Sequence, residues 1–237
     1  MEALRKSPSD PVMLNLSLNP LTSGSVDYIL ETVKTKPSLE AVVLQGSRLG
    51  DEGVKQLVEG LLYNHAQTKK LSSEEEEGSD SGKKELQELD LSDCKFGDVG
   101  AGAVAKLLNS DMDVDTLTLS YNHAISSQGW SLIGNALNGN RNLQTLTLDH
   151  NFIGNDGLQC LCSGLYDNRS LTALDLNDVG LSQAGGATLN ELLKRNTTIL
   201  EITLTGNRLT DEQIDNVQKY IALNKSVNPE VEDSIRN

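Results

Sequence analysis

Three side chains of this chain have the types needed for nucleophilic catalysis: Ser120, His150 and Asp178. They follow one another at intervals of 30 and 28 residues, so only a periodic fold would bring them together. A hydroxyl, an imidazole base and an orienting carboxylate work as a unit only within hydrogen-bond reach. His150 with Asp149 and Asp178 also has the ligand types of a metal site, although such a set arises easily on an acidic surface. Both hypotheses depend on the elements that carry these residues.

The residues lie in a leucine pattern that returns about every 28 residues. Its clearest copy runs from Leu143 to Ile153 in the frame L-x-x-L-x-L-x-x-N-x-I. The frame starts at Pro11, Leu39, Leu86, Val114, Leu143, Leu171 and Ile199. The steps are 28, 47, 28, 29, 28 and 28 residues, so one 19-residue insertion is the only large break. Such self-similarity predicts a solenoid, in which each unit buries its apolar face against its neighbours.

Each unit is predicted to hold one strand followed by one helix. Residues 145–148 alternate threonine and leucine, which is typical of a short strand. Leu158, Leu161 and Leu165 follow at helical spacing and share one helix face. The residues expected to cap helix N-termini are Asp51, Asp98, Asn155 and Thr210. Because a helix separates each strand from the next, the strands must be parallel.

The 28-residue frame with a strand and a full helix resembles the ribonuclease-inhibitor-type leucine-rich repeat family. Its relatives include ribonuclease inhibitor and the repeat regions of Ran GTPase-activating proteins, NOD-like receptors and tropomodulins. The resemblance covers residues 11 to about 224 and implies an α/β fold: a curved horseshoe of about seven repeats, with a parallel sheet on the concave side and helices on the convex side. We expect one domain over residues 1–224 and a flexible tail over residues 225–237. Unrelated activities sit on this scaffold, so the fold alone does not give the function.

In this family the ninth frame position usually carries asparagine, whose amide satisfies backbone groups of the turn after the strand. Here that position holds Asn19, Ser47, Cys94, Asn122, Asn151, Val179 and Asn207. Cys94 is a usual substitute and is therefore expected to be structural. Val179 cannot donate from its side chain, which predicts an irregular turn. Trp130 aligns with Leu158 in the helix frame and is predicted to lie in the core.

The insertion, at about residues 66–85, is rich in charge, serine and glycine. This composition predicts a disordered acidic loop. Ser72 and Ser73 each have a glutamate three residues later, a pattern that acidophilic kinases accept. The segment is either a solvated spacer or a docking segment regulated by phosphorylation at these two serines.

Composition limits the partners and the compartment. The net charge of −14 argues against nucleic acid and against an anionic membrane surface, because phosphates would be repelled. No apolar run approaches the roughly 20 residues of a membrane span, and residues 1–10 lack the apolar stretch of a signal peptide. Three cysteines form no even disulfide framework, which favours a cytoplasmic protein, with nuclear, cytoskeletal or ciliary association left open. Glycosylation sequons at Asn15, Asn168, Asn196 and Asn224 are interpreted as chance matches.

The concave surface can be listed from the frame, because it takes the residues two, four, six and seven positions after each start. None of these 28 positions holds lysine or arginine. The acidic members are Glu88, Asp90, Asp93, Asp149, Asp175, Asp178 and Glu201, and the first two units are more apolar, with Met13, Leu18, Ala41 and Val43. The last of the four positions gives the row Asp93, Tyr121, His150, Asp178 and Gly206 on successive strands. Adjacent strands lie about 4.8 Å apart, so these side chains are expected to form one acidic surface.

The sequence therefore favours a non-enzymatic protein-interaction module, a monomer by itself, that binds a basic protein without metal or cofactor. A flat open sheet offers no pocket and does not exclude water, which disfavours the Ser–His–Asp hypothesis. The residues expected to contact the partner are Tyr121, His150, Asp149, Asp175, Asp178, Glu88, Asp90 and Asp93. One alternative is a structural subunit of a cytoskeletal or ciliary assembly. Another, implied by the resemblance to Ran GTPase-activating proteins, is a regulator of a small GTPase that uses Arg48 or Arg208.

Overall fold

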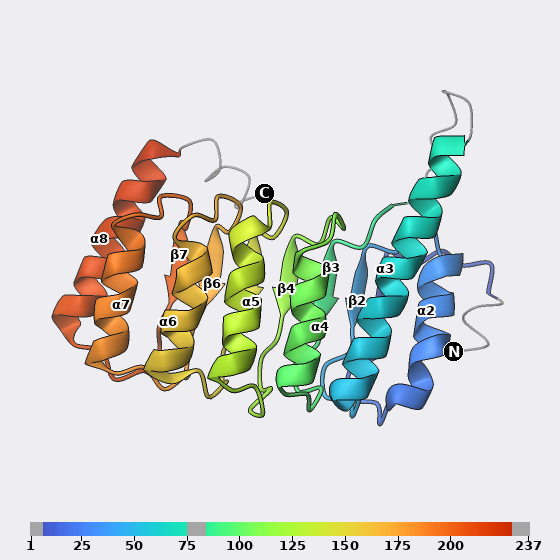
Figure 1. Ribbon diagram of the computed structural model, residues 1–237, viewed down its shortest axis with the longest axis horizontal. Coiled ribbons are helices and arrows are strands. Elements are labelled where there is room, and N and C mark those ends of the chain that lie inside the picture. Colours follow the sequence, from blue (N-terminus) through green and yellow to red (C-terminus); the bar gives the residue numbers. More distant parts are fainter. Residues whose placement is uncertain (1–6, 75–83, 229–237) are drawn as a thin grey trace.

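The computed structural model describes residues 7–74 and 84–228. Their strands form one parallel sheet in which spatial order equals chain order (Figure 1). The strands are β1 (Met13–Asn15), β2 (Ala41–Val43), β3 (Glu88–Asp90), β4 (Thr116–Thr118), β5 (Thr145–Thr147), β6 (Ala173–Asp175) and β7 (Glu201–Thr203). Every strand begins two residues after a frame start, so the leucine frame predicted all seven strands of the described chain.

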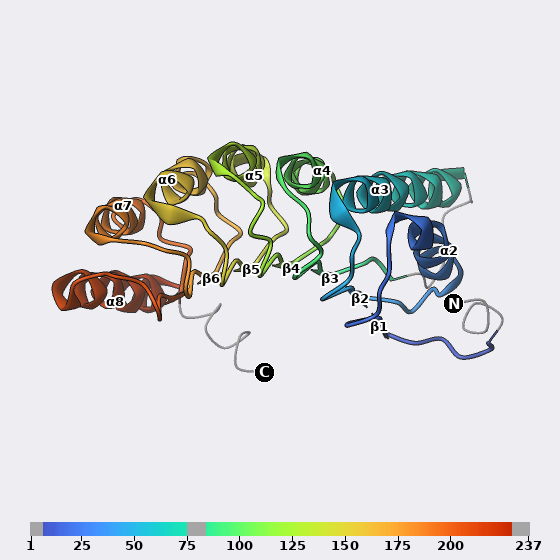
Figure 2. The ribbon, with the colours of Figure 1, turned by 90° about the horizontal axis from the view of Figure 1, so that it is seen from below.

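Helices follow the strands and cover one face of the sheet. They are α2 (Val26–Thr35), α3 (Gly50–Glu74), α4 (Asp98–Leu108), α5 (Ser127–Gly139), α6 (Gly154–Leu165), α7 (Gln183–Leu193) and α8 (Asp211–Val227), with a 3-10 turn η1 (Ser23–Ser25) before the first. Figure 2 shows the helices along the outside of a shallow arc and the strands along its inside. The predicted solenoid, with its sheet on the concave side, is confirmed.

The core lies between the sheet and the helices and is almost entirely aliphatic. In the fifth unit, Leu146 and Leu148 point inward from the strand and meet Leu158 and Leu161 of α6, and all four are at most 1% exposed. Trp130 on α5 is fully buried, so its predicted place in the core is confirmed. Aliphatic side chains at fixed positions let neighbouring units stack without adjustment, which is what a solenoid core requires.

The strands pair without any shift in register. Asp90 pairs with Thr118, Thr118 with Thr147, and Thr147 with Asp175, so these four residues form one row across β3 to β6. The middle residue of each of these strands is buried, whereas the residues beside it are half-buried and face the concave side. Asp90 and Asp175 therefore share a face, and Asp149, two residues beyond Thr147, lies on that face as well.

The turns after the strands use the ninth frame position as expected. The Asn151 side chain donates to the carbonyls of Leu148 (2.8 Å) and Leu119 (3.0 Å) and accepts from the Asn122 amide (2.8 Å). Cys94 takes this place in its own unit, with its sulfur 3.4 Å from the Leu44 oxygen. Each side chain thus closes its own turn and ties it to the unit before, and the structural role expected for Cys94 is confirmed.

The helix starts are capped differently from the sequence-based expectation. Thr210 caps its own helix, with a capping box to Gln213. Asp51 and Asp98, however, are not N-caps of α3 and α4. The Asp51 carboxylate accepts from Gly100 (2.7 Å) at the start of α4, one unit further along the chain.

The same reach joins two further pairs of units. Asp98 accepts from the Ser126 amide (2.8 Å) at the start of α5, and Asn155 accepts from the Ser182 amide (3.1 Å) at the start of α7. These three side chains satisfy amides that a helix cannot satisfy by itself, so each unit caps the helix of the next.

A second set of buried asparagines ties the units at the opposite edge of the sheet. We call Asn140, Asn168, Asn196 and Asn224 the asparagine ladder; all are at most 5% exposed. Asn196 illustrates the pattern, because its amide donates to the carbonyls of Leu165 (2.7 Å) and Asn168 (3.1 Å) and its oxygen accepts from Ile199 (3.0 Å). Three members had been interpreted as chance sequons. That interpretation is wrong, since their 28-residue spacing reflects a structural role and their burial prevents glycosylation.

Two segment boundaries differ from expectation. The disorder expected from about residue 66 is wrong for residues 66–74, because α3 continues as a helix to Glu74 and projects beyond its neighbours (Figure 1). Residues 75–83, the rest of the acidic segment, lie outside the described residues. Ser72 and Ser73 lie in the last turn of α3, and their phosphorylation stays a prediction.

At the other end of the domain, α8 extends to Val227, so residues 225–227 are helix rather than tail; residues 229–237 lie outside the described part. None of the helices described in residues 7–74 and 84–228 is long and apolar enough to cross a membrane.

The cysteines provide a test of the packing. Burial raises the pKa of the Cys94 and Cys162 thiols to about 12, whereas Cys160 is half-buried. Because the thiolate is the reactive form, we expect iodoacetamide at pH 8 to modify Cys160 alone in the native protein and all three cysteines in urea. Mass spectrometry of the digested protein measures this, and modification of native Cys94 would contradict the packing described.

Candidate functional site

The edge of the sheet where the strands end carries a row of residues with left-handed backbone. Its members and their φ angles are Leu18 (59°), Gly46 (73°), Asp93 (50°), Tyr121 (59°), His150 (56°), Asp178 (51°) and Gly206 (79°). Each residue up to Asp178 donates its amide to the next unit, as His150 does to the Asn177 oxygen (2.9 Å). Side chains at this position are therefore held in line across the units. Bulky residues rarely adopt this conformation, so Tyr121 occupies its place at an energetic cost.

Four rings gather at the centre of this edge, and we call Tyr121, His123, His150 and Phe152 the aromatic cluster. Tyr121 and His150 stack with ring centroids 4.4 Å apart and an interplanar angle of 19°. His123 and Phe152 stack at 4.6 Å and 24°, and Tyr121 lies 6.2 Å from His123. Tyr121 is 40% exposed and Phe152 is 72% exposed. The rings thus form a continuous, solvent-facing surface over the turns that follow β4 and β5.

Carboxylates flank the stacked pair. The His150 ring nitrogens lie 3.6 Å from an Asp149 oxygen and 3.8 Å from an Asp178 oxygen. Asp149 also accepts a hydrogen bond from the Ser120 hydroxyl, which fixes one of its oxygens. On the other side of Tyr121 the carboxylate of Asp93 is paired with Lys95. The negative charge nearest the rings therefore comes from Asp149 and Asp178.

The remaining predicted acids lie on the same face but divide into two groups. Glu88, Asp90 and Asp93 belong to the unit of β3, whereas Asp175 and Asp178 belong to the unit of β6. Threonines occupy the strand positions between them, on β4 and β5. The structure thus places carboxylates on both sides of a neutral centre, and the aromatic cluster lies at the edge of that centre.

Asp90 and Asp175 also have a local structural role. Each accepts a hydrogen bond from the amide two residues later, Ser92 (2.8 Å) or Asn177 (2.9 Å). Asp175 in addition accepts from the Thr203 hydroxyl at 2.5 Å. These bonds hold both carboxylates in fixed positions at the end of their strands, while the residues remain half-buried.

The geometry does not assemble the proposed nucleophile and base. The Ser120 hydroxyl donates to Asp149 and not to His150, and the serine is 5% exposed. His150 lies between two aspartates, which leaves it without the serine contact that would activate a nucleophile. In the part of the chain that the structure describes, no group of three or more His, Cys, Asp or Glu residues is arranged to hold a metal ion.

The two arginines considered for a GTPase-regulating role lie far apart. Arg48 follows β2 and Arg208 follows β7, and both side chains are exposed. Five strand spacings separate them, roughly 24 Å at about 4.8 Å each. They cannot act on one phosphate group, and the aromatic cluster lies between them.

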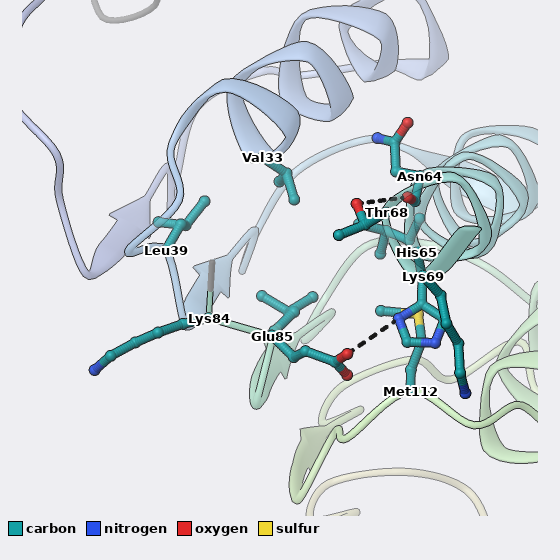
Figure 3. A pocket seen from close by; sticks show the side chains of 11 residues that line it. Val33, Leu39, Asn64, His65, Thr68, Lys69, Lys84, Glu85 and Met112 are labelled. Carbon is teal, nitrogen blue, oxygen red and sulfur yellow. Dashed lines mark hydrogen bonds and ion pairs between the residues drawn. The ribbon is translucent and has the colours of Figure 1, made fainter. Parts of the chain in front are cut away.

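A cavity of about 280 Å³ lies at the other edge of the sheet, between the long helix α3 and the segment that leads into β3. Its residues are Val33, Leu39, Leu61, Asn64, His65, Thr68, Lys69, Lys84, Glu85, Leu86 and Met112 (Figure 3). The charged groups at its rim pair with protein partners: His65 with Glu85 and Asp111, and Lys69 with Asp111. The rim thus satisfies its own charges and holds the end of α3 against the neighbouring unit.

The sequence identified Tyr121 and His150 but missed His123 and Phe152. The missed pair lies two residues further along, at frame position ten, where the strand-facing pattern has ended. Composition contained a signal, because aromatic residues make up only 3% of the chain, yet one of two phenylalanines and two of three histidines fall in these two turns.

Comparison with known proteins agrees with this architecture. A protein-family model described as "Leucine Rich repeat" matches residues 35–58, 84–105 and 139–162. "Leucine-rich repeat-containing protein 73" of Homo sapiens is 29% identical over 204 residues, which cover 84% of this chain and 58% of that protein. "Ribonuclease inhibitor" of Mus musculus is 26% identical over 221 residues, which cover 88% of this chain and 48% of that protein. The chain thus spans about half the length of these relatives.

A solved structure has the same fold. "Leiomodin-1 Actin-Binding Site 2 (ABS2)" superposes with a TM-score of 0.50, covers 89% of this chain and 95% of its own, and is 20% identical. At that identity the likeness concerns the fold alone. Seven strand–helix units in register, the matching repeat model and the likeness to ribonuclease inhibitor lead to one assignment. The chain belongs to the leucine-rich repeat proteins of the ribonuclease-inhibitor type.

Proposed function

We propose that this protein binds a basic protein partner through its concave face and the adjoining strand-end edge, and that it is not itself an enzyme. The observation that carries the proposal is the alignment of exposed rings and carboxylates on successive strands, without lysine or arginine at any of the 28 concave positions. A surface with one sign of charge attracts a partner of the opposite sign and speeds its association. Exposed aromatic side chains at its centre supply the contact energy that charges at the rim do not.

The architecture suits this role. Leucine-rich repeats are protein-interaction modules, and a stacked solenoid loses little conformational freedom when it binds. The contact surface rests on strands in register and on turns closed by Asn122 and Asn151, so its side chains are already positioned. We further propose that the chain is a monomer before binding and acts in the reducing cytoplasm, which its buried free thiols Cys94 and Cys162 support.

The charge contribution can be tested with a triple variant, Asp149→Asn, Asp175→Asn and Asp178→Asn. Asparagine retains the oxygen that accepts the hydrogen bonds at Asp175 and tolerates the left-handed backbone at Asp178. Each lost charge pair is worth about 0.5 kcal/mol, so we expect the affinity for a basic partner to fall about tenfold at low salt. The difference should shrink at high salt, because counterions screen exposed charges.

A matched control removes the same number of charges from the helices: Glu52→Gln, Asp156→Asn and Asp215→Asn, all exposed. Proteins captured from a native extract by each form are identified by mass spectrometry at low and high salt. The proposal expects basic proteins that the control retains and the concave variant loses. Retention of one and the same set by all three forms would count against it.

A further inference from the structure

The aromatic cluster is unusual for this molecule and has no role in its packing. The core is aliphatic, and Trp130 and Phe96, the large aromatic side chains within it, are fully buried. Tyr121 and Phe152 instead lie in solvent, on turns that do not need rings, and Tyr121 keeps an unfavourable backbone conformation there. Exposed rings held in fixed stacks are typical of the energetic centre of a protein interface.

The surroundings of the rings select the chemistry of an occupant. Asp149 and Asp178 lie beside His150, within 4 Å of its ring nitrogens, and both are at least partly exposed. Lys95, the cation at the neighbouring turn, is already paired with Asp93. A group that enters here meets ring faces on one side and carboxylate oxygens on the other, which is a cation site with a flat wall.

Arginine fits such a site better than lysine does. Its planar guanidinium stacks on an aromatic face while its N–H groups bind a carboxylate in the ring plane, and it loses hydration more easily than an ammonium group. Its aliphatic stem can lie along His123 and Phe152, the second stack of the cluster. Lysine would gain the charge attraction but not the stacking.

We propose that the aromatic cluster is an arginine-selective subsite, in which one arginine of the partner stacks on the Tyr121–His150 pair and bonds to Asp149 and Asp178. This inference rests on the proposed function, because it assumes that the concave face receives a basic segment. It adds a requirement that charge alone does not impose: the affinity depends on which cation the partner presents.

The probes are a fluorescein-labelled peptide that alternates arginine with glycine and serine, and its lysine twin. Fluorescence anisotropy at low salt is expected to show about fivefold tighter binding of the arginine peptide to the unmodified protein. Tyr121→Asn removes the ring and favours the left-handed backbone, so folding is not impaired; it should weaken arginine-peptide binding to the level of the lysine peptide. Tyr121→Phe should retain the preference, and Tyr63→Ala, which removes a tyrosine 64% exposed on α3, should change neither affinity.

The outcomes separate the two proposals. Equal affinity for both peptides, or an equal loss of both in Tyr121→Asn, overturns the arginine subsite and leaves the acidic surface standing. Failure of either peptide to bind at low salt overturns both. NMR signals of the Tyr121 and His150 rings should shift on addition of the arginine peptide. If they shift instead with protein concentration alone, a second copy of the chain occupies the cluster, and the proposed partner is wrong.

Discussion

Replacing Gly164 by alanine is expected to lower the free energy of unfolding by about 3 kcal/mol, because helices α5 and α6 touch through their backbones at this residue. A Cβ atom on Gly164 would lie 1.6 Å from the Gly134 oxygen, and one on Gly134 would lie 2.4 Å from the Cys160 oxygen. No side-chain movement relieves a clash with backbone, so the two units must separate. For a chain of this size the thermal midpoint should fall by roughly 10 °C.

The control for this variant is Gly139→Ala, at the end of α5, where an added Cβ meets nothing within 4 Å. Alanine favours the helix there, so the free energy of unfolding should be unchanged or slightly higher. Urea unfolding followed by circular dichroism measures both variants. The Gly164 variant also perturbs the two units that carry Tyr121 and His150, so the ring signals of this pair should move with it. Equal stability of both alanine variants would contradict the close contact.

Replacing Asn196 by alanine is also expected to lower the free energy of unfolding by about 3 kcal/mol. The change leaves the carbonyls of Leu165 and Asn168 without their donor and the amides of Thr198 and Ile199 without their acceptor. Each buried group left unsatisfied costs about 1–3 kcal/mol, although water entering the gap recovers part of the loss. Hydrogen exchange should accelerate mainly in the units of β6 and β7, since units of a solenoid contact only their neighbours.

Asn135→Ala tests whether loss of any asparagine has the same effect, because Asn135 is exposed on α5. We expect less than about 0.5 kcal/mol for this control. Chemical denaturation of both variants, fitted with a common slope, gives the difference. A small effect at Asn196 would mean that the asparagine ladder is replaceable by solvent.

The sequence predicted the strands because the leucine frame has a strict period, and the position of a residue in the frame fixes the face it occupies. It therefore also placed Tyr121 next to His150 and aligned Asp90 with Asp175. It did not predict the side chains that reach between units. Asp51 and Asp98 look like N-caps of their own helices in one dimension, yet in space the nearest free amides belong to the next helix.

The extension of α3 escaped prediction for a similar reason. Residues 66–74 are polar, which suggests disorder, but contacts with a distant residue stabilise the helix: Asp111 pairs with His65 and Lys69. Polar composition alone does not show whether such a partner exists. The stacking of His123 on Phe152 likewise depends on the paths of two turns that the leucine frame leaves undefined.

The asparagine ladder has a consequence for where this solenoid can grow. Its members stand three residues before a frame start, from Asn140 onward; the corresponding residues earlier in the chain include Lys36 and Asp111. A ladder amide binds the preceding unit and its own loop at once, which leaves no slack for added residues. The 19 extra residues enter before the ladder begins, where Asp111 turns outward to meet the lengthened helix. Length variation among related chains should accordingly concentrate in the N-terminal units, while the units that carry the rings keep a constant period.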